Sequence, residues 1–190
     1  MRVRHASVII FLFLVASACA PGAGGDAPAC GREDDPFFIL TAQAVPSATL
    51  LPCVDALRPG WRFEGSLVES GAARMWLESD RAGFRAVEAI LTPRCDVGDA
   101  IEVDPAPDEA GTRRFEEPVS LDPAYVANRY YVFDGGCITY RYRFAQGAAP
   151  TLALEADEAL SFVARSVYVE RVRDDFGLTL CGAGAPPCEG

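Results

Sequence analysis

The stretch Tyr130–Phe144, with the sequence YYVFDGGCITYRYRF, determines the fold class more clearly than any other part of the chain. Its middle, Asp134–Gly136, contains two glycines, which supply the positive φ angles that short hairpin connections need. From Ile138 onward, apolar or aromatic residues alternate with polar or charged ones. Alternation with a period of two predicts a strand that is buried on one face only. We therefore expect a β-hairpin whose second strand buries Ile138, Tyr140, Tyr142 and Phe144.

Other segments with the composition of strands precede this hairpin. Short runs of apolar residues separated by glycine-containing turns are typical of strands. The segment 45–60 contains three prolines, and we expect it to be irregular. The expected additional strands cover residues 62–69, 73–79, 84–91 and 113–119.

Helical spacing occurs near both ends of the chain. Asp35-Pro36 precedes an apolar run, a pattern that fits either a capped helix start or a buried strand. Residues 151–163 carry one apolar stripe, and residues 166–176 carry a second, with Ser166 as its cap and Gly177 as its end. Because the strands come first and the helices follow, we expect an α+β fold. In it, an antiparallel β-sheet of about five to six strands carries two C-terminal helices on one face.

The N-terminus has the three parts of a secretory signal peptide, namely a positive start, an apolar middle and a small-residue end. Its apolar segment is shorter than the roughly 20 residues that cross a bilayer as a helix. The residues Val15-Ala16-Ser17-Ala18-Cys19 resemble the lipobox of bacterial lipoproteins. That resemblance implies cleavage before Cys19 and attachment of diacylglycerol to its thiol. The commonest lipobox has Leu where this chain has Ala16, and Ala16-x-Ala18 also fits ordinary signal peptidase.

The cysteine count favours the lipoprotein reading. There are seven cysteines, and an exported protein with an odd number leaves one thiol to explain. If Cys19 carries lipid, six remain for three disulfides in an oxidising compartment. Sequence alone does not choose among the fifteen possible pairings, but we favour Cys30–Cys53, Cys95–Cys137 and Cys181–Cys188. We thus expect a signal peptide over residues 1–18, a lipid-anchored flexible linker over 19–29 and one globular extracytoplasmic domain over 30–190.

Charge and composition exclude several classes of partner and chemistry. Removing Arg2 and Arg4 with the leader takes the formal net charge from −10 to −12. Nucleic acids and anionic lipid surfaces need a basic footprint, so neither is an expected partner. The single histidine is His5, and no lysine occurs. We therefore do not expect Ser-His-Asp catalysis, a histidine-bearing zinc site or a P-loop. No cofactor is expected.

Carboxylates are the remaining catalytic candidates. Glu116-Glu117 with Asp122, or Glu155 with Asp157 and Glu158, are two groups from which an acid and base pair could come. Their spacing does not distinguish them from solvated charges. The acidic segment 96–112 is a conceivable calcium loop, but it lacks the EF-hand pattern and is expected to be solvated. We assign no catalytic or metal-binding residue.

The hairpin region also contains a candidate binding face. Arginine beside aromatic residues is a common composition for recognition of anions or proteins. The alternative is that these arginines pair with the many acids of a solvated sheet face. We expect a non-catalytic binding module, with a small molecule or an envelope protein as partner; a carboxylate-dependent envelope enzyme acting on glycans is the second hypothesis. A structural partner of a membrane complex is the third. The candidate face comprises Trp76, Arg129, Arg141 and Arg143.

Overall fold

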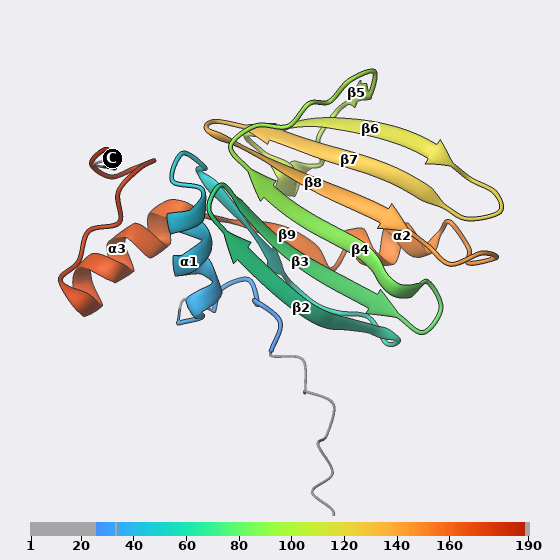
Figure 1. Ribbon diagram of the computed structural model, residues 1–190, viewed down its shortest axis with the longest axis horizontal. Coiled ribbons are helices and arrows are strands. Elements are labelled where there is room, and N and C mark those ends of the chain that lie inside the picture. Colours follow the sequence, from blue (N-terminus) through green and yellow to red (C-terminus); the bar gives the residue numbers. More distant parts are fainter. Residues whose placement is uncertain (1–25, 33, 189–190) are drawn as a thin grey trace, which may run out of the picture.

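The described residues form two antiparallel sheets, of which the larger has seven strands in the order β2-β3-β4-β8-β7-β6-β5 (Figure 1). The smaller sheet pairs β1 with β9. The computed structural model describes residues 26–32 and 34–188. The expected signal peptide and the lipidation site Cys19 lie outside the described residues.

The strands are β1 (Leu50–Val54), β2 (Trp61–Glu69), β3 (Ala72–Ser79), β4 (Gly83–Thr92), β5 (Ile101–Val103), β6 (Arg113–Ser120), β7 (Val126–Phe133), β8 (Gly136–Arg143) and β9 (Leu160–Ala164). The helices are α1 (Pro36–Ala44), α2 (Leu152–Asp157) and α3 (Arg165–Phe176), with a 3₁₀ turn, η1 (Pro107–Glu109). The α+β class is confirmed, but the expected strand number was too low.

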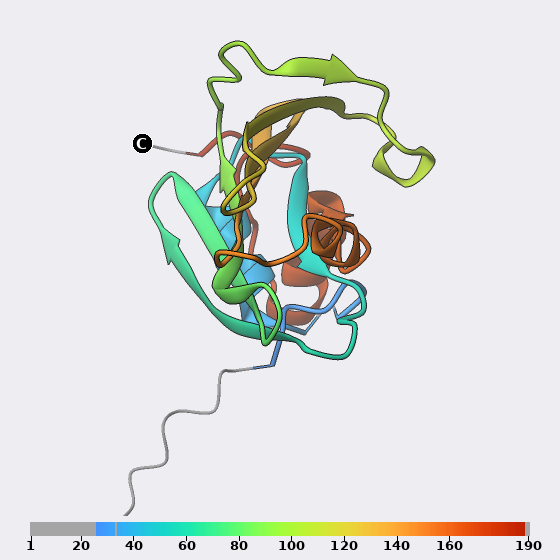
Figure 2. The ribbon, with the colours of Figure 1, turned by 90° about the vertical axis from the view of Figure 1, so that its right-hand side faces the viewer.

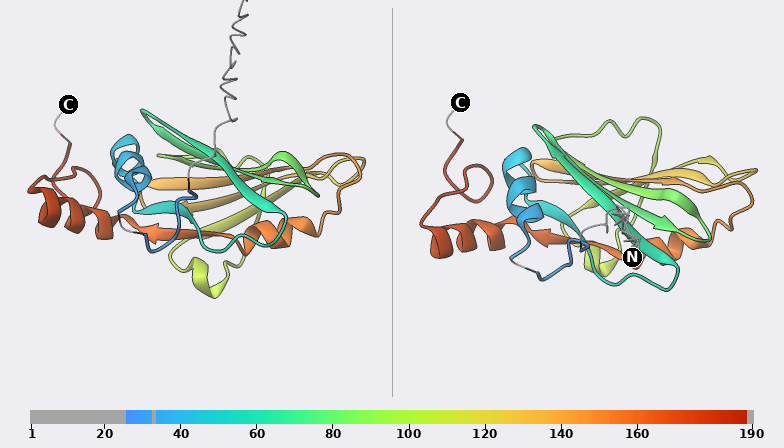
Figure 3. Two further views of the ribbon diagram at one scale, coloured as in Figure 1. Left: turned by 90° about the horizontal axis from the view of Figure 1, so that it is seen from below. Right: turned by 60° about the horizontal axis from the view of Figure 1, so that its bottom comes forward.

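One face of the seven-stranded sheet, here called the inner face, carries the core. The β1–β9 sheet lies across this face, with α1 at one end and α2 at the other (Figures 2 and 3). Phe162 of β9 packs its ring 4.9 Å from that of Tyr131 and 6.1 Å from that of Tyr140. The expected alternation in β8 is confirmed, since its inward side chains are at most 4% exposed: Ile138, Tyr140 and Tyr142, with Phe144 just after the strand.

Two expectations about local structure were wrong. The segment 45–60 contains β1 despite Pro52, because β1 pairs along the strand only with β9 and an edge strand tolerates a residue without an N–H group. The helix expected over 151–163 ends at Asp157, and Leu160–Ala164 is a strand instead. The apolar residues there have a helical spacing, but this segment forms a strand because it pairs with β1 and packs Phe162 on the inner face.

The helices at the two ends of the chain pack on each other rather than both lying flat on the sheet. Asp35 caps α1 by accepting a hydrogen bond from the Phe37 N–H, so of the two structures that the sequence allowed here the capped helix is the one observed. The ring of Phe38 stacks on that of Tyr168 of α3, with centroids 4.7 Å apart. Helix α3 begins one residue before Ser166 and has no side-chain cap, whereas Gly177 ends it in the left-handed conformation.

The strand order requires a long crossover, which lies on the outer face, the face opposite the core. Strand β4 ends beside β8, but the chain next forms β5 and β6 beyond β7. Cys137 precedes the inward-facing Ile138, so its side chain points outward. Its disulfide to Cys95 therefore holds the crossover against the outer face.

The three disulfides are the pairs that we favoured from the sequence. Cys30–Cys53 ties the segment before α1 to β1, Cys95–Cys137 ties the crossover to β8, and Cys181–Cys188 closes the C-terminal loop. In the described ranges no helix is long and apolar enough to span a bilayer.

Candidate functional site

The four residues of the expected binding face do not lie together. Trp76 and Arg141 share a row across the outer face, because each is directly opposite Glu88 in the neighbouring strand. Arg143 is two residues beyond Arg141 on the same strand and is exposed at its end. Arg129 is opposite the buried Tyr140, so it points to the inner face. Arg129 therefore does not share a face with Trp76 and Arg141, contrary to the expectation of one common face.

The outer face contains a hollow of about 300 Å³ beside the crossover, which we call the crossover hollow. Ile90 and Thr139 are neighbours on β4 and β8 and are almost fully buried in it, at 4% and 6% exposure. The crossover contributes Cys95 and its neighbours. The hollow thus combines an apolar floor with polar walls. Its lining residues are Arg74, Ile90, Thr92, Arg94, Cys95, Asp96, Tyr130, Thr139 and Arg141.

Two arginines of the crossover hollow share one carboxylate. Arg74 Nη1 lies 3.1 Å from Glu88 Oε1, and Arg141 Nη1 lies 3.5 Å from Glu88 Oε2. Each guanidinium carries five N–H donors, so one shared carboxylate leaves most of them unused. Arg74 also contacts Glu69, with 3.9 Å between Nε and Oε1, and Asp96 lines the same hollow, so positive and negative side chains are close to balanced here.

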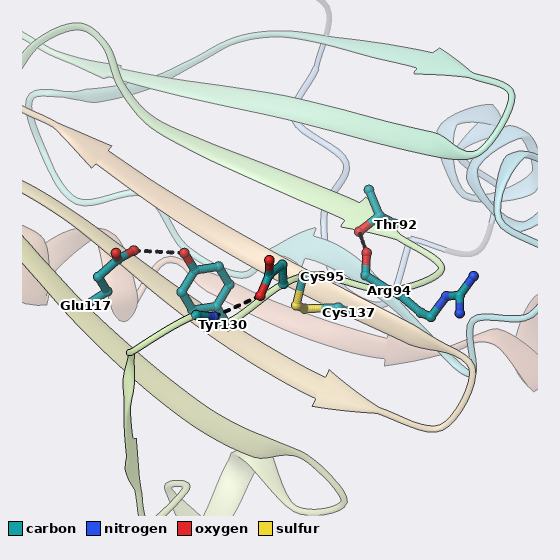
Figure 4. The surroundings of a disulfide bond; sticks show 8 residues. Thr92, Arg94, Cys95, Glu117, Tyr130 and Cys137 are labelled. Carbon is teal, nitrogen blue, oxygen red and sulfur yellow. Dashed lines mark hydrogen bonds between the residues drawn. A yellow bond between two sulfur atoms is a disulfide. The ribbon is translucent and has the colours of Figure 1, made fainter.

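The rim of the crossover hollow is fixed by the disulfide and by hydrogen bonds (Figure 4). The Thr92 hydroxyl donates to the carbonyl oxygen of Arg94 at 2.9 Å, and the Tyr130 hydroxyl donates to Glu117 at 2.9 Å. The side chain of Arg94 extends away from the disulfide and is exposed (Figure 4). Arg94 pairs with no carboxylate in the part of the chain that the structure describes.

A second outer-face feature involves Trp76. The guanidinium of Arg85 lies 4.4 Å from the centroid of the Trp76 ring and is held by Glu64 through two hydrogen bonds of 3.0 and 3.2 Å. Arg85 has a φ of +46°, which is unusual for a residue with a side chain. Phe84 beside it is 69% exposed. The Arg85 guanidinium therefore covers one face of the Trp76 ring.

The inner face contains an ion network instead of a free binding surface. Arg129 contacts Asp157 at 2.7 Å and Glu116 at 3.1 Å, and its own side chain is 12% exposed. Arg114 bridges Glu116 and Glu109. Every charge of this network therefore has an opposite charge beside it, as buried charges require.

The carboxylates considered for catalysis are mostly occupied by donors. Glu155 accepts from Arg81 and from Trp61 Nε1, and Glu158 pairs with Arg58. Hydrogen bonds from Asn128 and Tyr130 lower the pKa of Glu117, and those from Arg81 and Trp61 lower the pKa of Glu155. A general acid needs a raised pKa, and these shifts have the opposite direction.

Buried tyrosine hydroxyls complete the inner face. Burial raises the pKa of both Tyr140 and Tyr142, so each remains protonated at neutral pH. The Tyr142 hydroxyl donates to Asp157, whereas the Tyr140 hydroxyl has no partner among the described residues. These two side chains belong to the core.

The acidic segment 96–112 is partly structured. It contains β5 and η1, and Glu102 pairs with Arg113 at 2.9 Å while Glu109 accepts from the Tyr131 hydroxyl at 2.8 Å. Within residues 26–32 and 34–188, no group of three or more His, Cys, Asp or Glu side chains is placed to hold a metal ion.

Comparisons with known proteins identified no relative. No family model, no curated protein and no solved structure matches the chain. The functional argument therefore depends on the residues of this chain.

Sequence reasoning missed Arg74 and Tyr130 in the crossover hollow. A signal for Arg74 was present, because it lies two residues before Trp76 and strand alternation puts both on one face. Tyr130 likewise alternates with the inward-facing Tyr131. The crossover residues that line the hollow could not be predicted, because their position depends on the strand order, which the sequence did not reveal.

Proposed function

We propose that this chain is a lipid-anchored, extracytoplasmic binding module of the bacterial cell envelope. In this proposal Cys19 carries the lipid and the crossover hollow binds a carboxylate-bearing ligand. Nucleic acid is not a proposed partner, because the net charge of −10 opposes it.

The anchor is supported by the cysteine pairing. The three disulfides use all six cysteines after Cys19, so no cysteine remains in this chain to pair with Cys19. A lipid thioether accounts for that thiol, and a diacylglyceryl group provides the two chains that stable anchoring needs. Pro28 and Ala29 pair with Val54 of β1, so the flexible part of the proposed linker ends before them.

The observation that carries the binding function is the shared use of Glu88 by Arg74 and Arg141 in the crossover hollow. Guanidinium groups match a planar carboxylate through paired N–H donors. Glu69, Glu88 and Asp96 offset the arginines of the hollow, so it offers guanidinium donors without a net positive charge, which disfavours a polyanion. Ile90 on the floor offers apolar contact to the body of the ligand.

Photocrosslinking in the native envelope tests the binding site. A photoreactive phenylalanine analogue at Thr92, on the rim of the hollow, is expected to give one dominant adduct, identified by mass spectrometry. The same analogue at Phe176, which is 61% exposed on α3, is the matched control and should not give that adduct. Arg141→Ala should abolish the Thr92 adduct without unfolding the chain, since Glu88 keeps its contact with Arg74. Identical adducts at both positions, or an adduct indifferent to Arg141→Ala, would refute the site.

A further inference from the structure

Asp96 is the only carboxylate among the described residues that line the crossover hollow. It directly follows Cys95, so the disulfide to Cys137 holds it at the outer face. Its Oδ1 accepts a hydrogen bond from the Gly98 N–H at 3.0 Å, which leaves Oδ2 as a further acceptor. Across residues 26–32 and 34–188, no arginine forms an ion pair with Asp96.

The register of β8 places Asp96 at one end of the hollow. Cys137, Thr139 and Arg141 are alternate residues of this strand, so all three point to the outer face. Thr139 belongs to the floor and lies between the other two. Because a strand rises about 3.4 Å per residue, the Cα atoms of Cys137 and Arg141 are roughly 13 Å apart. Asp96 lies at the Cys137 end, beside the disulfide.

The paired guanidinium groups lie at the other end. Arg74 and Arg141 both contact Glu88, which is directly opposite Arg141 in β4. Arg94 is close to Asp96 in sequence, but its side chain extends away from the disulfide (Figure 4). The hollow therefore has an unpaired carboxylate at one end and guanidinium donors at the other. Complementary charges at both ends of a ligand give specificity for that ligand.

The length of the hollow favours a ligand longer than a free amino acid. In an amino acid, the ammonium nitrogen and the carboxylate carbon are only about 2.5 Å apart, and one more residue adds up to about 3.6 Å. A hydrogen bond at each end adds roughly 3 Å. A dipeptide thus joins groups about 12 Å apart, which is closer to the strand spacing than the roughly 8 Å of an amino acid. The volume of about 300 Å³ lies at the lower end for ligand pockets, which favours small side chains.

We propose that the crossover hollow binds a zwitterionic dipeptide with small side chains. Its carboxylate accepts hydrogen bonds from Arg74 and Arg141, its ammonium group donates to Asp96, and its side chains contact Ile90. This inference rests on the proposed function, because it names the ligand class of the same hollow. It adds a role for Asp96, which the proposed function does not require.

Calorimetric titration of the purified full chain, with its disulfides intact, tests the ligand class. We expect L-alanyl-L-alanine to bind at one saturable site. N-acetyl-L-alanyl-L-alanine lacks the ammonium group and L-alanyl-L-alanine amide lacks the carboxylate. Each is expected to bind about tenfold or more weakly, because a charge-assisted hydrogen bond is lost at one end. Equal binding of the acetylated dipeptide would overturn the zwitterion and leave the carboxylate site intact.

A charge-neutral variant tests the role of Asp96. Asp96→Asn keeps the size of the side chain and an acceptor for the Gly98 N–H, but it removes the charge. It is expected to weaken binding of L-alanyl-L-alanine about tenfold or more and to leave the acetylated dipeptide unaffected. Asp99→Asn removes the same charge from the crossover outside the lining and is the matched control, with unchanged binding expected. Wild-type affinity in Asp96→Asn would contradict the assignment.

Failure of this inference is distinguishable from failure of the proposed function. Absence of saturable binding of L-alanyl-L-alanine would overturn the dipeptide. The photoadduct at Thr92 then decides about the carboxylate site. An adduct that still depends on Arg141 would retain that site with a different ligand, whereas absence of the adduct as well would overturn both.

Discussion

Arg129 of β7 and Asp157 of α2 form an ion pair, with 2.7 Å between Nη1 and Oδ2, that joins the seven-stranded sheet to the layer covering its inner face. The Tyr142 hydroxyl donates to the same carboxylate, and Glu116 of β6 contacts the other side of the guanidinium. This contact therefore connects β6, β7, β8 and α2 through one arginine.

Arg129→Met is expected to reduce the free energy of unfolding by about 2–3 kcal/mol. Breaking a fully buried pair costs ~3–5 kcal/mol because the remaining charge stays unpaired, and this pair retains partial exposure. Urea denaturation followed by circular dichroism measures the change. Arg62→Met on the outer face, which breaks the more exposed pair with Glu78, is the control and should cost less than about 1 kcal/mol. Equal effects of the two variants would show that the network does not join the layers.

The alternation and turn chemistry of the sequence predicted most of the seven-stranded sheet. They were sufficient for β8, where each inward residue found a buried position. They were insufficient at Phe162, because a short apolar segment fits helix and strand spacing equally and only its partner β1 decides. Arg129 was misplaced because its face depends on the register with Tyr140, which composition does not contain.

The double substitution of Cys95 and Cys137 by serine is expected to lower stability by about 2–4 kcal/mol and to loosen the crossover. The bridge closes a loop with a sequence separation of 42, and such cross-links act mainly on the unfolded chain. In native-state hydrogen exchange, the variant should exchange faster than the wild type, and this increase should be larger in residues 93–100 than in β8. The matching pair of changes at Cys181 and Cys188, separated by 7 residues, should leave exchange in the crossover unaltered.

We expect the free energy of unfolding to depend on pH in the acidic range and not near neutral pH. The pKa of Glu116 is lowered: burial alone would raise it, but the hydrogen bond from Arg114 and the charge of Arg129 outweigh burial. Hydrogen bonds from Asn128 and Tyr130 lower the pKa of Glu117. A carboxyl with a depressed folded-state pKa contributes stability that is complete above its unfolded pKa, about 4.3 for glutamate, and is lost as the pH falls through the folded value.

Urea denaturation across a pH series measures this dependence. The free energy of unfolding should be nearly constant from about pH 6 to 8, because His5 is the only histidine and lies in the expected leader. It should fall below about pH 4.5, and less steeply in Glu116→Gln than in the wild type. A large change in the free energy of unfolding between pH 6 and 8 would contradict the conclusion that carboxyl groups such as Glu116 set the pH dependence.

Two hairpin glycines allow the cost of a positive φ to be distinguished from the cost of a steric clash. Gly135 and Gly71 have φ of +69° and +83°. A Cβ at Gly135 would lie 1.8 Å from the Ser47 carbonyl oxygen, whereas one at Gly71 would have open space. Gly71→Ala should therefore cost only about 1 kcal/mol, the usual conformational penalty. Gly135→Ala should cost clearly more in thermal or urea unfolding, and equal costs would show that the turn moves away from Ser47 freely.

The candidate sites were less predictable than the fold. Arg141 and Trp76 were identified from composition, but the crossover hollow also requires Arg74 and the disulfide-bound segment. Asp96 gave no distinct signal, because it belongs to an acidic segment that we expected to be solvated. Only the pairing of Cys95 with Cys137 places it at the hollow.

The most direct test of the proposed lipid-anchored module is mass spectrometry of the N-terminal peptide of the protein isolated from its native membranes. We expect the chain to begin at Cys19 and that residue to carry a diacylglyceryl group, with Cys19→Ala released from the membrane fraction. An unmodified thiol at Cys19, or membrane retention of Cys19→Ala, would contradict the proposal.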